Sequence, residues 1–248
     1  MVLSGDRIVF FRYGTKETEY LKARDARLGS LIERIGHIDR ETDPDLFSSV
    51  IRHIIGQQIS SKAQKTIWNR MLDSFGSVTP DVIAAAGIPR LQSFGMTFRK
   101  ADYIAGFASD VLRGKVDLGT IERMTDEDAI RTLTGIRGIG TWTAEMILLF
   151  SLGRPDILSF GDLAIQRGLR MVYHHKAITP ALFRKYQHRF SPYGSVASLY
   201  LWAAAAGAVP ELRDYAPLSV KKGKSLKQGA TALPTSQSVS SRSANPRT

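Results

Sequence analysis

The sequence predicts an all-α protein. Helix start and stop signals recur along the chain, with apolar residues at helical spacing between them. Strand-forming residues are confined to residues 7–13, where Ile8, Val9, Phe10 and Phe11 favour extended structure, either as a hairpin arm or as an N-terminal strap. We therefore expect packed helices with at most a short β element at the N-terminus.

Caps, prolines and glycines place the expected helices. Asp43 and Pro44 precede a helix with one apolar stripe, formed by Leu46, Phe47, Val50, Ile51, Ile54 and Ile55. Ser60 or Ser61 can cap the next helix, and residues 97–112 form another amphipathic one. Two more starts are expected at cap-then-proline pairs, Thr79 with Pro80 and Thr179 with Pro180. Ends are expected at five glycines: Gly76, Gly87, Gly114, Gly153 and Gly207.

The composition excludes several classes of protein. The chain has 248 residues, of which 43% are hydrophobic, enough for one or two domains with a full core. No apolar run approaches the roughly 18 to 20 residues of a membrane span, and the N-terminus shows no secretory signal. The absence of cysteine excludes a disulfide scaffold, a thiolate zinc site, an iron–sulfur cluster with cysteine ligands and a cysteine nucleophile. The histidines are scattered and form no evident metal set: His37, His53, His174, His175 and His188.

The charge suggests a polyanionic partner. The formal net charge is +11, and six of these charges lie in residues 216–248, which contain no Asp or Glu. This tail is rich in Ser, Lys, Gly, Pro and Thr and has no aromatic residue, so we expect it to be disordered. Residues 1–215 carry the remaining +5. The charge alone fits a nucleic-acid partner or a solvated surface with a cationic tail.

Residues 133–169 are the most informative segment. A helix starting near Thr125 is followed by the turn Ile-Arg-Gly-Ile-Gly at 136–140, and a second helix begins at 141–143. Gly138 and Gly140 lack Cβ atoms, so backbone N–H groups of the turn and of the helix N-terminus can approach a phosphate. The aliphatic spacing would pack the two helices together through Leu133, Ile136, Ile139, Ala144 and Ile147. A GxG alone would fit an ordinary helix–helix turn, but the whole pattern is more specific.

This run resembles a helix-hairpin-helix. With GDLAIQRGL at 161–169, it is similar to the helix-hairpin-helix DNA glycosylases, and most similar to the 3-methyladenine DNA glycosylase II (AlkA) type. Further similar stretches are IIGQQIS at 54–60, LQSFGMTFRKADYI at 91–104 and SVASLYLWAAAA at 195–206. The resemblance covers roughly residues 20–207. It implies two helical subdomains that flank a DNA-binding cleft: residues 1–42 with 155–215, and residues 43–154, followed by the basic tail 216–248.

The resemblance implies a DNA glycosylase of base excision repair. Such an enzyme flips alkylated purines of the 3-methyladenine and 7-methylguanine type out of the duplex, hydrolyses the N-glycosidic bond and leaves an abasic site. Asp162 matches the catalytic aspartate of the family. A carboxylate there would stabilise the oxocarbenium-like sugar or orient the attacking water. Asp162 would also suit the N-cap of a helix over 163–173, and the two roles are compatible.

Trp142 indicates a monofunctional enzyme without lyase activity. Family members that also cleave the strand have a lysine at this position, whose amine forms a Schiff base. Trp142 would instead form an aromatic wall or pack beneath the hairpin. Trp202 matches a pocket tryptophan, which would stack on an electron-poor base or belong to the core. Met146 stands where the best-known members have a pocket tyrosine, which leaves the preferred lesion open.

The resemblance also implies contacts to double-stranded DNA. Gln58 matches the residue that fills the gap left by the flipped nucleotide, although it could be a plain turn residue, and Gln57 would bond to backbone between helices. Gly138, Gly140 and Thr143 are expected at the DNA backbone. The carbonyl groups of Thr134, Ile136 and Ile139 are expected to hold a monovalent cation, Na+ or K+. No other cofactor and no iron–sulfur cluster is expected.

The N-terminus departs from the family pattern. Many members carry a β-rich domain there, and this chain has only about twenty residues, so contacts from that domain would be lost or replaced by Phe10, Phe11 or Tyr13. A DNA-holding module without activity is disfavoured by Asp162 together with Gln58 and Trp202. A glycosylase for oxidised or mismatched bases is disfavoured by the missing lysine and cysteines. We expect a monomer without membrane contact, in the bacterial cytoplasm at the nucleoid or in a eukaryotic nucleus.

Overall fold

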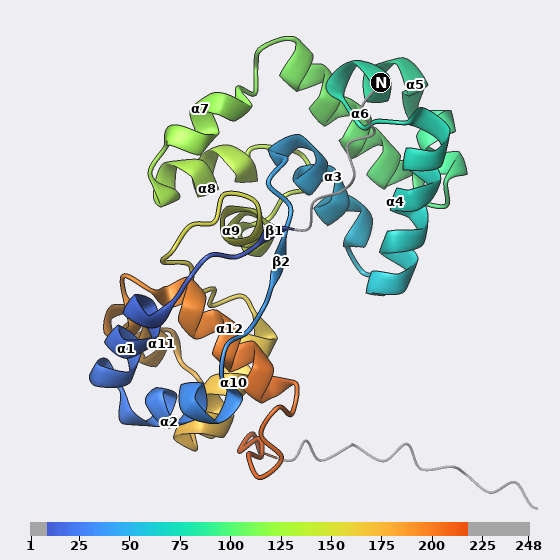
Figure 1. Ribbon diagram of the computed structural model, residues 1–248. Helices are drawn as coiled ribbons and strands as arrows, with labels where there is room; N and C mark the ends of the chain where they lie inside the picture. The colour runs from blue at the N-terminus through green and yellow to red at the C-terminus, as the bar shows by residue number, and fades with distance from the viewer. Residues whose placement is uncertain (1–8, 218–248) are drawn as a thin grey trace, which may run out of the picture. The chain divides into compact units, whose positions relative to one another are not determined.

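The computed structural model describes residues 9–217, and helices dominate this part of the chain (Figure 1). The described residues up to Ala216 belong to one compact unit. One two-stranded sheet accompanies the helices, so the predicted all-α fold with a short β element is confirmed. No helix among the described residues is both long and apolar enough to cross a membrane. The basic tail lies outside the described residues from position 218 onward.

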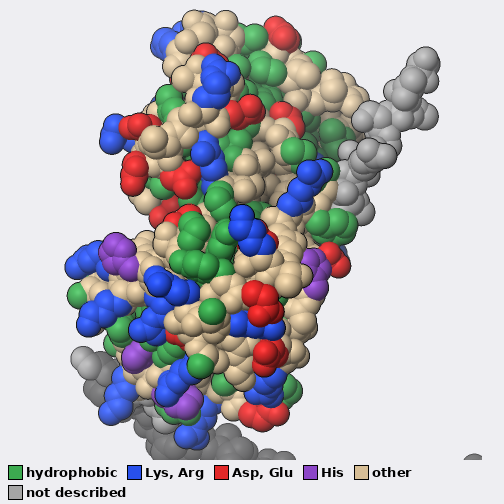
Figure 2. All heavy atoms as spheres, turned by 60° about the vertical axis from the view of Figure 1, so that its left-hand side comes forward, with side chains coloured by type: hydrophobic (Ala, Val, Ile, Leu, Met, Phe, Trp, Pro, Cys, Tyr) green, Lys and Arg blue, Asp and Glu red, His purple; other side chains and the backbone are tan. Residues whose placement is uncertain are grey.

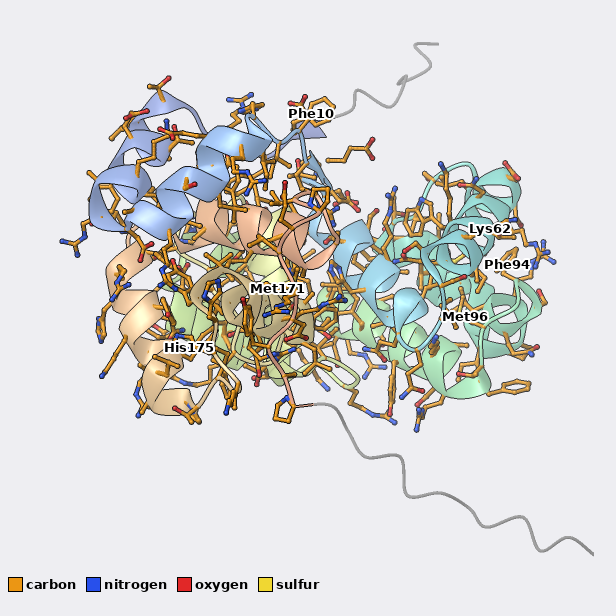
Figure 3. All side chains as sticks on the ribbon, turned by 90° about the horizontal axis from the view of Figure 1, so that it is seen from below. Phe10, Lys62, Phe94, Met96, Met171 and His175 are labelled. Carbon is orange, nitrogen blue, oxygen red and sulfur yellow. The ribbon has the colours of Figure 1, made fainter. Side chains whose placement is uncertain are left out.

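The helices contact one another in two groups. The first group is continuous in sequence and comprises α3 (Leu46–Gly56), α4 (Ser61–Phe75), α5 (Pro80–Ser93), α6 (Phe98–Leu112), α7 (Leu118–Arg123), α8 (Asp126–Thr134) and α9 (Thr141–Phe150). The second group joins distant parts of the sequence: α1 (Thr15–Arg24), α2 (Ala26–Ile35), α10 (Leu163–Tyr173), α11 (Pro180–Phe190) and α12 (Gly194–Ala205). Figure 3 shows the buried side chain of Met96 with the first group and that of Met171 with the second.

Side-chain caps set most helix starts. The caps accept hydrogen bonds from backbone N–H groups two or three positions further on: Asp25, Asp45, Ser60, Thr79, Thr97, Asp117, Thr125, Asp162 and Thr179. Six of the nine were expected as caps or start signals. The helix predicted from Asp43 starts slightly later, because the Asp45 carboxylate accepts the Ser48 N–H. Helix α1 was not predicted from the sequence, because Leu21 is its only buried residue and most of its other side chains are polar.

The β element is an N-terminal strap rather than a hairpin arm. Strand β1 (Val9–Phe10) pairs antiparallel with β2 (Glu41–Thr42), and α1 and α2 lie between the two strands in sequence. Phe11 extends the pairing through its N–H, which donates to the Arg40 carbonyl at 2.8 Å. Within the described residues the strand ends at Phe10, before the predicted end at residue 13, and residues 7 and 8 lie outside the described part.

Three helices of the second group together carry basic but no acidic side chains. Residues 163–210, which form α10 to α12, contain six Lys or Arg residues and no Asp or Glu. Figure 2 shows one face on which basic side chains predominate in the lower half, with some acidic ones toward its right, while acidic and basic side chains are evenly mixed above. Close helix packing in this group depends on Gly168, because a Cβ there would lie 2.3 Å from the Leu201 carbonyl oxygen of α12.

Candidate active site

One face of α9 lines a pocket of about 660 Å³. Trp142, Met146 and Phe150 are four residues apart, so they project from the same side of the helix. The segment between α2 and α3 (residues 36–45, called the strap below and distinct from the N-terminal strand β1) contributes to the lining. The remaining lining comes from this strap and from both helix groups: Ile38, Arg40, His53, Gly56, Gln57, Gln58, Ser61, Gln64, Asp162, Leu199, Trp202, Ala203 and Ala206. The structure thus brings together in one pocket four site residues expected from the sequence: Gln58, Met146, Asp162 and Trp202.

Asp162 lies in this pocket and also caps α10. Its Oδ1 accepts the N–H groups of Ala164 and Ile165, both at 2.9 Å, and its Oδ2 accepts the indole Nε1–H of Trp142 at 2.9 Å. The side chain is 7% exposed. A carboxylate oxygen has about two acceptor positions, so these bonds fix the group and leave one position on Oδ2 for a water or a substrate. The same side-chain arrangement therefore lets Asp162 cap α10 and present its carboxylate to the pocket.

A second carboxylate, that of Glu145, lies close to Asp162. The Ser159 hydroxyl donates to Glu145 of α9, and the Ser159 carbonyl accepts the Asp162 N–H at 3.4 Å. Burial raises the pKa of Glu145, the bond from Ser159 opposes this, and the charge of Asp162 adds to the rise. The sequence alone did not indicate this pair, because its members meet only when the loop before α10 packs on α9.

Aromatic side chains form much of the pocket wall. Trp202 of α12 is half-buried and stacks on Phe150, with ring centroids 5.6 Å apart and planes inclined by 25°. Trp142 is 44% exposed, so it is a pocket wall rather than packing beneath the hairpin. Met146 is buried and lines the pocket one helical turn after Trp142 on α9. Their contacts with a base stay predictions.

Gln58 occupies a strained turn at the pocket edge. Its φ of 57° is left-handed, which is uncommon for a residue other than glycine and frequent at functional sites. Lys100 holds this turn, since its Nζ donates to the carbonyls of Ile55 at 2.8 Å and Gln57 at 2.6 Å. Burial, and secondarily the charge of Arg99, lowers the pKa of Lys100. Lys100 was not singled out from the sequence, although it lies in the stretch at 91–104 that resembles the family.

Gln57 ties this turn to the hairpin. Its Nε2 donates to the Gly138 carbonyl at 2.7 Å, which confirms the expected bond to backbone. Gly138 has a φ of 91°, and a Cβ there would lie 2.3 Å from Cδ2 of Tyr103. Its lack of a side chain is therefore needed for folding as well as for any approach of a phosphate. Gly140 has nothing within 4 Å of a built Cβ and leaves open space.

The hairpin presents an uncapped helix end. Gly140 is the N-cap of α9 and supplies no side-chain hydrogen bond, so the first backbone N–H groups of α9 remain available to an anion. The five aliphatic residues predicted to lock α8 to α9 are all buried. Thr143 is also buried, at 6% exposure, so a contact from its hydroxyl to DNA is not supported and only its backbone N–H belongs to this helix end.

The predicted cation site lies in the same turn. Thr134 ends α8, and the Ile136 carbonyl accepts the Ile139 N–H at 3.0 Å, which leaves it one lone pair. These carbonyl oxygens suit a weakly held monovalent ion. Among the described residues there is no group of three His, Cys, Asp or Glu side chains that could hold a metal ion.

The N-terminal contact to the pocket differs from the expectation. Phe10, Phe11 and Tyr13 do not line it, whereas Ile38 and Arg40 do. The Tyr13 hydroxyl instead accepts the Ile38 N–H at 2.7 Å and so positions the strap. Of the two alternatives, replacement by these three residues is therefore not supported at the pocket, because the first strand supports the second, and the second continues the segment that carries the pocket residues.

Comparisons with known proteins identify the family of the chain. Residues 51–192 match the family model "HhH-GPD superfamily base excision DNA repair protein". DNA-3-methyladenine glycosylase 1 of Schizosaccharomyces pombe is 30% identical over 217 residues, which cover 84% of this chain and 93% of that protein. The crystal structure of a DNA-3-methyladenine glycosidase from Bacillus halodurans has a TM-score of 0.75 at 34% identity and covers 84% of this chain and 97% of that one. The S. pombe 3-methyladenine DNA glycosylase Mag1 in complex with abasic DNA has a TM-score of 0.68 at 30% identity, with 77% and 97% covered. The chain belongs to the HhH-GPD superfamily of base excision DNA repair proteins.

Proposed function

We propose that the protein is a monofunctional DNA glycosylase that removes alkylated purines of the 3-methyladenine and 7-methylguanine type and leaves an abasic site. The observation that carries this proposal is the Asp162 carboxylate, which three N–H donors hold in a pocket with an aromatic wall. Relatives with 30% and 34% identity are named for 3-methyladenine, and one of them is a complex with abasic DNA. These names support the lesion class and double-stranded DNA as the partner.

Cleavage follows from the charge that builds on the sugar. A flipped base would lie over Met146 against Trp202, with its glycosidic bond toward Asp162. As the C1′–N bond breaks, its electron pair stays on the base, and the positive charge moves to the sugar, where the carboxylate stabilises it. Water then adds to C1′ and gives up a proton, for which the free acceptor position of Asp162 Oδ2 is available. An alkylated base that starts as a cation leaves neutral, so no strong general acid is needed.

The hairpin and the turn at Gln58 would hold the DNA. Backbone N–H groups at Gly140 and at the start of α9 would bind a phosphate, and a monovalent ion on the carbonyls of Thr134, Ile136 and Ile139 would add positive charge beside it. Gln58 would enter the gap in the stack, as its strained turn at the pocket edge suggests.

Two residues support the absence of lyase activity. Trp142 occupies the Schiff-base position, and no Lys lines the pocket among the described residues. The amine of Lys100 is engaged by two carbonyl groups. Borohydride should therefore trap no covalent complex between the protein and DNA, and a trapped band that needs an intact active site would overturn this part of the proposal.

The direct test uses duplexes that carry one modified base. Wild-type protein in excess is incubated with duplexes containing 7-methylguanine or 8-oxoguanine, and abasic sites are revealed by alkali. We expect release of the methylated base, no release of the oxidised base, and strand cleavage only after alkali. Binding to the methylated duplex without release would indicate a non-enzymatic DNA module and would refute the proposal.

A further inference from the structure

A second cavity lies where α10 ends, away from the pocket on α9. Its volume is about 490 Å³, and it shares no lining residue with that pocket. Its walls come from the junction of α1 and α2, from the end of α10 with the turn after it, and from α11. Tyr173 ends α10 eleven residues after Asp162, which corresponds to roughly 16 Å of helix. Figure 3 labels His175, which lines the cavity, within the second helix group.

The second cavity carries an excess of positive charge. Its lining contains three arginines, Arg24, Arg27 and Arg189, and one acidic residue, Asp25, so its formal charge is +2 with histidine neutral. The Asp25 carboxylate is already engaged. Its Oδ1 accepts the N–H groups of Arg27 and Leu28 at 3.0 and 2.9 Å, and its Oδ2 accepts a guanidinium N–H of Arg189 at 2.7 Å. The excess charge therefore belongs to Arg24 and Arg27.

The guanidinium group of Arg27 faces this cavity without an anionic partner. Among residues 9–217, no ion pair involves Arg24 or Arg27. Burial, and secondarily the charge of Arg27, lowers the pKa of His175, so this imidazole is neutral at pH 7. Burial raises the pKa of Tyr186 to about 12, and the charges of Arg189 and Arg27 oppose this rise. The charge of Arg27 thus acts on two side chains of the same cavity.

Neutral hydrogen-bonding groups lie beside these charges. The Tyr186 hydroxyl and His175 Nε2 are 2.7 Å apart. The Tyr173 hydroxyl is buried and has no hydrogen-bond partner in the described part of the chain. Burial, and secondarily the nearby Asp25 carboxylate, raises the pKa of Tyr173, so its hydroxyl keeps its proton and can donate. A buried donor without a partner is costly, and an oxyanion that enters beside this ring would supply an acceptor.

This set of groups favours a phosphate ligand. Arginine binds phosphate through the paired N–H donors of its planar guanidinium group. A phosphate dianion also balances the formal charge of the cavity, whereas a cation would be repelled and a neutral molecule would leave the charge of Arg24 and Arg27 uncompensated. The volume of the cavity exceeds that of one phosphate group, so a small organic substituent on the phosphate can be accommodated.

We propose that this cavity is a second binding site of the protein, for a phosphate dianion that is either free or part of a small phosphomonoester. Arg24 and Arg27 bind the phosphate oxygens, and the hydroxyl of Tyr186 with the ring of His175 forms the adjoining wall. The site is separate from base release, because it shares no residue with the pocket on α9. Only the folded protein presents this cavity, so the ligand stabilises the fold by mass action.

The test is a titration of the full chain with sodium phosphate and, in parallel, with glycerol 3-phosphate. It is run at pH 7.5 and at constant ionic strength set with sodium chloride, and the NMR signals of the His175 ring are followed. Wild type should show a saturable shift with a dissociation constant of about 1 mM or lower for at least one of the two ligands. Arg27→Gln should weaken binding about tenfold or more, and Arg24→Gln should also weaken it.

Arg34→Gln is the matched control, because it removes the same charge from an exposed position of α2 that pairs with Glu211 outside the cavity. It should change the dissociation constant by less than about twofold. A shift that does not saturate, or equal binding by Arg27→Gln and wild type, would overturn the inference. Displacement of phosphate by undamaged duplex DNA would make the cavity a contact for the DNA backbone and would overturn it as well.

Base release separates this inference from the proposed function. Arg27→Gln should release 7-methylguanine from a duplex at the wild-type single-turnover rate, because Arg27 lies outside the pocket on α9. A large loss of release in this folded variant would show that the cavity serves the reaction and would contradict a separate site. Failure of phosphate binding with normal base release would refute only the second site.

Discussion

The two ends of the pocket hold their charges in different ways. At one end, three N–H donors fix the nearly buried carboxylate of Asp162, so its own hydrogen bonds determine its position. At the other end, Arg40 is exposed, and its backbone bond to Phe11 and its place on the Phe150 ring determine where its charge lies. A charge that hydrogen bonds fix before the reaction stabilises a transition state better than a charge on an exposed side chain. Changes at the Asp162 end should therefore lower the rate of base release more than changes at the Arg40 end.

The largest effect is expected for Asp162→Asn. Asn caps helices about as well as Asp, so the fold should be retained, but the negative charge facing the sugar is lost. Single-turnover base release should fall by at least about 100-fold. Affinity for the duplex should stay equal or rise, because one negative charge near phosphates is removed. Near-wild-type release by a folded variant would exclude Asp162 from the chemistry.

Trp142→Phe should have the next largest effect. It keeps an aromatic ring in the wall but removes the donor to Asp162 Oδ2. A hydrogen bond to a charged group contributes about 1.5 to 3 kcal/mol, so release should slow by roughly 10-fold or more while affinity for abasic DNA changes little. Trp68→Phe is the control, because the Trp68 indole nitrogen is buried without a hydrogen-bond partner among the described residues. An equal loss in both variants would show that Trp142 does not act through Asp162.

The two hairpin glycines should separate folding from DNA binding. Gly138→Ala should lower the free energy of unfolding by about 1 to 3 kcal/mol, because of its positive φ and the clash with Tyr103. Gly140→Ala should stay within about 0.5 kcal/mol of wild type, since its surroundings are open. Gly140→Leu should then weaken duplex binding at every salt concentration, as measured by titration. Unchanged binding would remove this helix end from the DNA contact.

Glu145→Gln should have the smallest effect, and it should depend on pH. Because the pKa of Glu145 is raised in the folded protein, mainly by burial, its ionisation destabilises the fold once the pH exceeds the unfolded-state pKa. The variant removes this cost, and its amide oxygen can still accept from Ser159. The gain in Tm over wild type should thus be larger at pH 7 than at pH 4, by about 1 to 3 °C, since the carboxylate is only partly buried. A larger gain at pH 4 would contradict the direction of the shift.

The Asp162 end of the site could be predicted from the sequence because its signals are local. The hairpin, Trp142, Met146 and Asp162 lie within residues 133–169, where spacing and resemblance fix their relation. The predicted bounds of the helix over 163–173 were confirmed for the same reason, since an Asp cap and an apolar period define it.

The Arg40 end could not be predicted, because tertiary contacts create it. Ile38 and Arg40 reach the pocket only when the strap pairs with an N-terminal strand that lies two helices away in sequence. The strand-forming residues near Phe10 predicted only the supporting strand of this pair, and not the strap that lines the pocket. The role of Glu145 could not be predicted either, because its hydrogen bond from Ser159 follows from no spacing in the sequence.

The most direct test of the central claim is the identity of the base set free from DNA. Duplex DNA methylated on its purines is incubated in parallel with wild type, with Asp162→Asn and without protein, and the free bases are quantified by mass spectrometry. We predict 3-methyladenine and 7-methylguanine above the spontaneous background with wild type, and background amounts with Asp162→Asn. Equal amounts from both proteins, or background amounts from wild type that binds the DNA, would contradict the claim that this pocket and its carboxylate excise alkylated bases.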